Sequence, residues 1–145
     1  MREFLAIEEL VPHRPPMLLI DKVRASSEGQ IECAARVAED SIFARDGRVP
    51  SVVLMEYMAQ AIAARNQLIA VQEGGPKKGM LLGCRKMTLH GPSIPVGADV
   101  IIRATVLRES GGVAIYSCEA ISDGVLSAEA QLTVAVIEPS EGADE

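Results

Sequence analysis

The feature that most constrains this fold is one long helix candidate, residues 51–73, whose first half is apolar on nearly every face. The Pro-Ser pair at its start and the Gly-Gly-Pro run at 74–76 supply a start and a stop. Its first half reads SVVLMEYMAQAIAA, with Glu56 and Gln60 as the strongly polar exceptions. A helix that is apolar all round is a buried helix, so the rest of the chain has to be arranged around it.

The rest of the chain favours antiparallel strands. A short amphipathic helix at 3–10 ends at prolines, and Gly111-Gly112 and Asp123-Gly124 predict tight hairpin turns. Strands are expected at residues 17–23, 30–38, 80–90, 98–109, 112–122 and 125–138, the last four as a meander. One long helix without a second helical layer packs most easily when about six antiparallel strands curl around it. We therefore predict an α+β hot-dog fold, a sheet wrapped around one central helix.

The chain length predicts a single domain. Its 145 residues fit one hot-dog domain over residues 1–138, followed by a polar, acidic tail at 139–145 that we expect to be disordered. A hydrophobic fraction of 48% with 23% charged residues is typical of a globular protein. A curled sheet leaves edge strands exposed, and pairing two domains along an edge covers them. A dimer is therefore expected.

Charge and composition exclude several function classes. A net charge of −6 argues against nucleic acid as a partner, because neutralising phosphates requires a basic face. The N-terminus lacks the apolar core of a signal peptide, and no uninterrupted apolar stretch reaches membrane-spanning length, so we expect a soluble cytoplasmic protein. Cys33, Cys84 and Cys118 are scattered, which favours buried free thiols over disulfides. No metal or diffusible cofactor is indicated, since the histidines, cysteines and acids lack ligand spacing.

Glu56 is the main candidate for chemistry. A carboxylate within an apolar helix is costly unless something there requires it, and burial raises a carboxyl pKa toward the range useful for acid–base catalysis. A structural ion pair with Arg14 or Arg85 is the alternative, and both explanations stay open at this point. Gln60 lies four residues further on the same helix face, where it fits an orienting or structural role.

The start of the long helix and one histidine add to this candidate site. The backbone amides of Ser51 and Val52 lack partners within the helix and lie just over one turn from Glu56, so they can bind an oxyanion. The Ser51 side chain fits a plain helix cap equally well. His13 is held between prolines in VPHRPP, whereas His90 fits a surface or structural position.

Three stretches resemble a known enzyme family. Residues 10–23 (LVPHRPPMLLIDKV), 51–64 (SVVLMEYMAQAIAA) and 90–107 (HGPSIPVGADVIIRATVL) are similar to the 3-hydroxyacyl-acyl carrier protein dehydratases of fatty acid synthesis. The similarity runs to about residue 138 with the elements in the same order. The Pro-Pro-Met and Glu-Tyr-Met-Ala-Gln-Ala wording looks closest to the branch associated with aryl polyene biosynthesis clusters.

The resemblance implies a dimer with its active sites at the subunit interface. In the family, an acid on the central helix of one subunit works with a histidine of the other, and syn elimination of water forms a trans-2-enoyl thioester. Glu56 matches the helix acid, and Ser51 falls where the family has a glycine whose amide binds the thioester carbonyl. The family's Gly-His-Phe-Pro histidine has no counterpart, because residues 40–50 contain no histidine. Our hypothesis is that His13 replaces it.

Three functions remain open on these residues. In a dehydratase, Glu56 and His13 divide the acid and base work, while Ser51 and Val52 stabilise the enolate oxygen. A hot-dog thioesterase using Glu56 as base or nucleophile needs no histidine. A non-catalytic partner subunit of a heterodimeric dehydratase also accounts for the missing histidine.

The partner implied by the resemblance is an acyl carrier protein with a phosphopantetheine-linked acyl group. Acyl carrier proteins are acidic, so this acidic chain needs a local basic patch to bind one. The candidates are Arg45 and Arg48 before the helix, and Lys77, Lys78, Arg85 and Lys86 after it. Scattered solvated charge is the alternative explanation of both groups.

Overall fold

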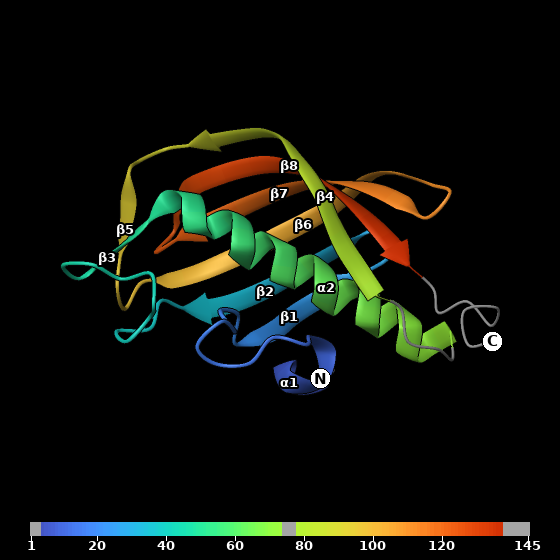
Figure 1. The fold of residues 1–145 in the computed structure, drawn as a ribbon, viewed down its shortest axis with the longest axis horizontal. Coiled ribbons are helices and arrows are strands. Elements are labelled where there is room, and N and C mark those ends of the chain that lie inside the picture. The colour runs from blue at the N-terminus through green and yellow to red at the C-terminus, as the bar shows by residue number, and fades with distance from the viewer. Residues whose placement is uncertain (1–3, 74–77, 138–145) are drawn as a thin grey trace.

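The computed structural model describes residues 4–73 and 78–137, and within them one long helix lies against a curved antiparallel sheet (Figure 1). The helix, α2 (Leu54–Glu73), has 20 residues and follows directly from a short 3-10 turn, η1 (Ser51–Val53). A further short helix, α1 (Ile7–Leu10), packs against α2 near the N-terminus. The predicted central helix and the α+β hot-dog architecture are confirmed.

The described residues form a six-stranded main sheet in the order β1-β2-β6-β7-β8-β4, with all neighbours antiparallel. Its strands are β1 (Lys22–Ser27), β2 (Gln30–Arg36), β4 (Lys78–Leu89), β6 (Asp99–Ser110), β7 (Val113–Ser122) and β8 (Val125–Ile137). The sheet curves behind α2, and β4 contacts the helix as it crosses it (Figure 1). The edges of the sheet are therefore β1 and β4. The prediction of a strand at 17–23 is wrong, because the Leu19 and Ile20 amides bond the Gln60 side chain instead of a neighbouring strand, and β1 begins only at Lys22.

The strand order corrects one prediction, since the last four strands do not form a simple meander. Only β6, β7 and β8 do, while β4 pairs with β8 at the far edge and β2 pairs with β6. A second, two-stranded sheet pairs β3 (Arg48–Pro50), which leads into η1, with β5 (Ser93–Pro95), which lies between β4 and β6 in the chain. These two strands were not predicted, because three residues with a proline carry no periodic pattern.

The two predicted hairpin turns are confirmed by their backbone angles. Gly111 and Gly112 have φ of 59° and 80°, and Asp123 and Gly124 have φ of 47° and 82°. A two-residue turn with positive φ at both positions matches the twist of the paired strands. These turns therefore join β6 to β7 and β7 to β8 tightly, which leaves little freedom in their register.

The core lies between α2 and the concave face of the sheet. Every second residue of β7 is buried, and α2 covers that face with large side chains such as Leu54, Tyr57, Met58 and Ile62. Many sheet residues under the helix are small, namely Ala104, Ala114, Ala120, Ala128 and Ala130. Small residues on a sheet let a helix approach closely, so these alanines leave room for the large side chains of α2.

The cysteines are free, and two of the three are buried as expected. Burial raises the pKa of the Cys33 thiol and of the Cys118 thiol to about 12, so both stay protonated. Cys84 is exposed on β4, which corrects the expectation that all three are buried. None of the helices within residues 4–73 and 78–137 is long and apolar enough to cross a membrane. The expected disordered tail at 139–145 lies outside the described residues.

Candidate active site

The structure brings His13 and Glu56 together from distant parts of the chain. His13 Nε2 lies 3.8 Å from Glu56 Oε1, and the two side chains are 28% and 34% exposed. This distance is too long for a hydrogen bond, although catalytic pairs commonly tighten only when substrate is bound. Both side chains are partly exposed, so a substrate can reach them, while most of each side chain is shielded from water.

His13 is held in place by the fold of its own loop. The Arg14 guanidinium donates hydrogen bonds to three backbone carbonyl oxygens, at 3.0 Å to Val11, 2.7 Å to His13 and 3.0 Å to Glu8. The prolines that follow restrict the backbone further. Arg14 therefore clamps the loop, and in the described part of the chain the ion-pair contact of Glu56 is with His13 rather than with Arg14 or Arg85.

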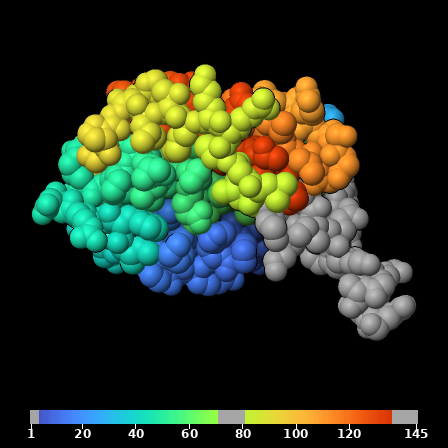
Figure 2. Space-filling model, turned by 45° about the horizontal axis from the view of Figure 1, so that its top comes forward, coloured from blue at the N-terminus to red at the C-terminus, as the bar shows by residue number. Residues whose placement is uncertain are grey.

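Glu56 is half-exposed, which corrects the expectation of a fully buried carboxylate. Glu56, Ala59 and Ala63 lie three and four residues apart, so they share one face of α2, and all three are only partly buried. The sheet covers the opposite side of the helix. Atoms of α2 (green) are accordingly visible in Figure 2 between β4 (yellow-green) and the N-terminal segment (blue).

Gln60 connects α2 to the segment that leads into β1. Its side chain is fully buried, and its Oε1 accepts hydrogen bonds from the Leu19 amide at 2.8 Å and the Ile20 amide at 3.4 Å. Its Nε2 donates to the Met17 carbonyl oxygen at 2.7 Å. Both ends of this amide are taken by backbone, so we assign Gln60 a positioning role rather than contact with substrate.

The two expected oxyanion donors differ in their surroundings. The Ser51 amide donates to the Pro92 carbonyl oxygen at 3.0 Å, and the residue is 1% exposed, so this N–H is already used. Val52 is 51% exposed and occupies the second position of η1, where a helix amide has no partner within the helix. Val52 is therefore the donor we retain for an oxyanion.

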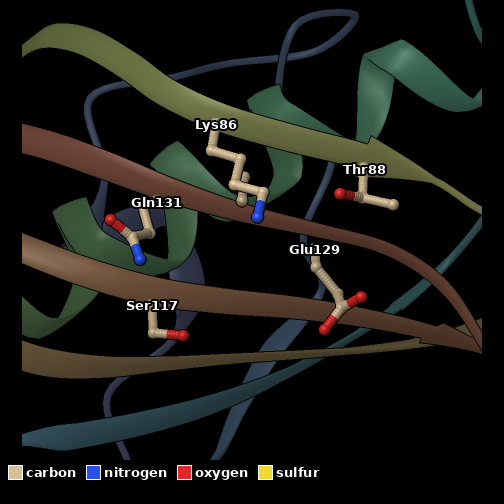
Figure 3. Close-up of a pocket in the computed structure, with 6 residues that line it drawn as sticks. Lys86, Thr88, Ser117, Glu129 and Gln131 are labelled. Atoms are coloured by element: carbon tan, nitrogen blue, oxygen red, sulfur yellow. The ribbon is translucent and has the colours of Figure 1, made fainter.

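His90 lies away from this site, on the outer face of the sheet. Its Nε2 is 2.8 Å from Glu129 Oε2, in agreement with the expected structural role. A shallow pocket nearby is lined by Lys86, Thr88, Ser117, Glu129, Ala130 and Gln131. Figure 3 shows these side chains on strands in front of the helix, so the pocket is separated by the sheet from the face of α2 that carries Glu56.

Comparison with known families identifies the chain. A model of the ApeP-like family, described as ApeP dehydratase, matches residues 5–144. The chain belongs to the ApeP-like dehydratase family. This confirms the resemblance to hot-dog dehydratases and to the aryl-polyene branch.

Individual relatives agree with this assignment. The 3-hydroxyacyl-[acyl-carrier-protein] dehydratase FabZ of Streptococcus gordonii is 30% identical over 141 residues, which are 94% of this chain and 99% of that protein. FabZ of Streptococcus pneumoniae serotype 4 is also 30% identical, with the same coverage. The similarity to FabZ therefore extends over nearly the whole of this chain and of both relatives.

Solved structures give the same fold. The dehydratase heterocomplex ApeI:P from Xenorhabdus doucetiae superposes with a TM-score of 0.86 at 25% identity, covering 97% of this chain and 95% of that one. A hypothetical thioesterase from Streptococcus pneumoniae, solved with coenzyme A, has a TM-score of 0.63 at 13% identity and covers 83% and 88%. At that identity the thioesterase similarity shows a shared fold alone.

The role of Gln60 predicts a large effect on stability. Gln60→Leu keeps the volume but leaves backbone groups of residues 17–20 buried and unpaired, so we expect a loss of about 2–4 kcal/mol in the free energy of unfolding. Urea denaturation measures this difference. Gln67→Leu is the matched control on a half-buried position of α2, where we expect a change within about 0.5 kcal/mol. Equal stability of the two variants would contradict the positioning role.

Proposed function

We propose that this dehydratase removes water from 3-hydroxyacyl groups carried as thioesters by an acyl carrier protein, forming trans-2-enoyl thioesters. Its FabZ relatives carry this substrate class in their names. The observation that supports the residue assignment is the 3.8 Å approach of His13 and Glu56 on the uncovered face of α2. The three free thiols are consistent with a reducing compartment, and we propose the cytoplasm.

The proposed chemistry divides acid and base work between these two side chains. One of them takes the proton from C2, and the electron pair of that bond forms the C2–C3 double bond. The C3–O bond breaks, and the departing hydroxyl takes a proton from the other side chain to leave as water. Syn elimination requires both groups on one side of the acyl chain, and the 3.8 Å approach of His13 and Glu56 supports this arrangement. The Val52 amide stabilises the negative charge on the thioester oxygen.

This proposal predicts the effect of removing either group. Glu56→Gln and His13→Ala should each lower the dehydration rate about 10²–10⁴-fold, the range for lost general acid or base catalysis. Mass spectrometry of a 3-hydroxyacyl carrier protein measures the loss of one water. A His90→Ala variant is the matched control and should keep full activity, since His90 bonds Glu129 on the far face of the sheet.

Other outcomes of the same experiment decide between the alternatives. Release of free acid and thiol instead of an enoyl product would support the thioesterase function. Full activity of His13→Ala would show that this histidine does not replace the one missing from residues 40–50.

A second candidate function is that of partner subunit in a heterodimeric dehydratase. It is supported by the missing loop histidine and by the similarity to a protein solved as the ApeI:P heterocomplex. A chain of this kind would complete the active site of a related subunit. Activity that appears only when a histidine-containing hot-dog dehydratase is added to the purified chain would favour this function.

The proposed dimer, with itself or with such a partner, uses the β4 edge. Leu81, Leu82 and Leu89 on this strand are 40%, 55% and 42% exposed, whereas the exposed residues of the β1 edge are polar or small. An exposed edge strand with apolar side chains favours pairing with another strand. Such pairing also brings a second subunit beside the uncovered face of α2, because β4 crosses that helix.

A charge on this edge should break the dimer. We expect Leu82→Glu to convert the dimer to monomers, because a carboxylate would be buried without a partner in the interface. Light scattering after gel filtration measures the mass. Val125→Glu is the control, since Val125 is 66% exposed at the hairpin between β7 and β8. A Leu82→Glu variant that stays dimeric would place the interface elsewhere.

For carrier docking we favour Arg45 and Arg48 over the basic residues after the helix. Both arginines are exposed just before η1, and Arg48 is held by hydrogen bonds to Ser93, at 2.6 Å to Oγ and 3.0 Å to the carbonyl oxygen. Lys86 instead lines the pocket on the outer face of the sheet. Lys77 lies outside the described residues.

Docking by these arginines predicts salt-dependent binding. Arg45→Glu should weaken binding of an acyl carrier protein about tenfold at low salt and reduce its salt dependence, because an attraction becomes a repulsion. Titration calorimetry at two ionic strengths tests this. Arg108→Glu, an exposed position at the far end of β6, serves as the control. Equal losses in both variants would indicate a general charge effect rather than a docking site.

A further inference from the structure

The position of the Val52 amide depends on the strand that precedes it. β3 ends at Pro50 and η1 begins at Ser51, so a movement of β3 would carry the proposed oxyanion donor with it. Three residue pairs join β3 to β5, namely Arg48 with Pro95, Val49 with Ile94 and Pro50 with Ser93. The placement of this donor therefore depends on a very short ladder.

Backbone hydrogen bonds hold the η1 end of this ladder only lightly. There the Ser51 amide donates to the Pro92 carbonyl oxygen at 3.0 Å. Pro92 has no N–H group with which to return a second bond. Bonded and non-bonded pairs alternate between antiparallel strands, so the neighbouring pair of Pro50 with Ser93 exchanges no backbone bond. The end of the ladder nearest Val52 is therefore held by one backbone bond.

The Arg48 side chain adds a second connection at this end. Its Nε donates to Ser93 Oγ at 2.6 Å, and its Nη2 donates to the Ser93 carbonyl oxygen at 3.0 Å. Ser93 lies opposite Pro50, two residues beyond Arg48, so this contact runs diagonally across the two strands. Two hydrogen bonds from one planar guanidinium fix direction as well as distance. The contact therefore resists sliding of β3 along β5.

We infer that Arg48 and Ser93 are positioning residues, which hold the Val52 amide where it can donate to the thioester oxygen. This inference rests on the proposed dehydration, in which that oxygen gains negative charge at the transition state. A displaced donor loses much of its effect, since such stabilisation depends on prearranged geometry. The two side chains therefore influence the reaction without contacting the reacting atoms.

The test uses 3-hydroxyacyl groups on pantetheine, so that carrier docking by Arg48 does not enter the measurement. Ser93→Ala should lower kcat about tenfold and leave KM within about twofold, because the oxyanion charge develops only at the transition state. Arg48→Gln should lower kcat at least as much. Ser117→Ala, on the outer face of β7, is the matched control and should keep kcat. An unchanged kcat in Ser93→Ala would overturn the inference.

A double variant shows whether the two residues act through one contact. Ser93→Ala combined with Arg48→Gln should lose no more activity than Arg48→Gln alone, because the latter already removes both hydrogen bonds. Losses that multiply would contradict a shared contact. The urea midpoints of Ser93→Ala and Ser117→Ala should agree. A merely structural role of Ser93 would instead lower its urea midpoint together with kcat, and that result would overturn the inference.

The NMR signal of the Val52 amide keeps the test independent of the proposed reaction. In Glu56→Gln, where turnover is expected to be slow, a pantetheine 3-hydroxyacyl thioester should shift this signal more than the matching thioether, which lacks the carbonyl. Adding Ser93→Ala should abolish most of that difference. This result without dehydration by the unaltered chain would support the positioning role and overturn the reaction. Dehydration together with a difference that Ser93→Ala leaves intact would overturn the positioning role and leave the reaction standing.

Discussion

The buried amide of Gln60 is the interaction on which the candidate active site depends. It joins the middle of α2 to the backbone of residues 17–20 through both of its polar atoms. That segment follows directly from the loop clamped by Arg14, so the position of His13 relative to Glu56 is set through this contact. Because an unpaired amide in this core is costly, few other arrangements of loop and helix are compatible with it.

The second constraint is the face of α2 that the sheet leaves uncovered. A six-stranded sheet curled around one helix cannot cover it on every side, and the first half of this helix is largely apolar. The uncovered strip holds Glu56 and two alanines, with the apolar β4 edge beside it. The proposed partner subunit and the proposed acyl chain would both bind at this uncovered face of α2. Dimer formation and catalysis would therefore depend on the same surface.

Much of the fold follows from local patterns in the sequence, whereas the pairing of the edge strand β4 with β8 does not. The helix, the five strands of the main sheet other than β1 and both hairpin turns follow from hydrophobic periodicity and turn residues, and the family follows from the stretches around His13 and Glu56. The sequence predicted that β4 starts the meander, but β4 pairs with β8 instead. The sequence of a strand does not indicate a partner that is so distant in the chain. The sheet of β3 and β5 was not predicted because its strands are only three residues long.

The sequence by itself determined which residue types are available for chemistry, and the tertiary structure decided which of them meet. It identified Glu56, His13, Gln60, Ser51 and Val52 as candidates. Only the folded chain shows that His13 approaches Glu56 and that Gln60 and the Ser51 amide are used by backbone. Burial and hydrogen bonding depend on neighbours far away in the chain, and a linear pattern does not specify those neighbours.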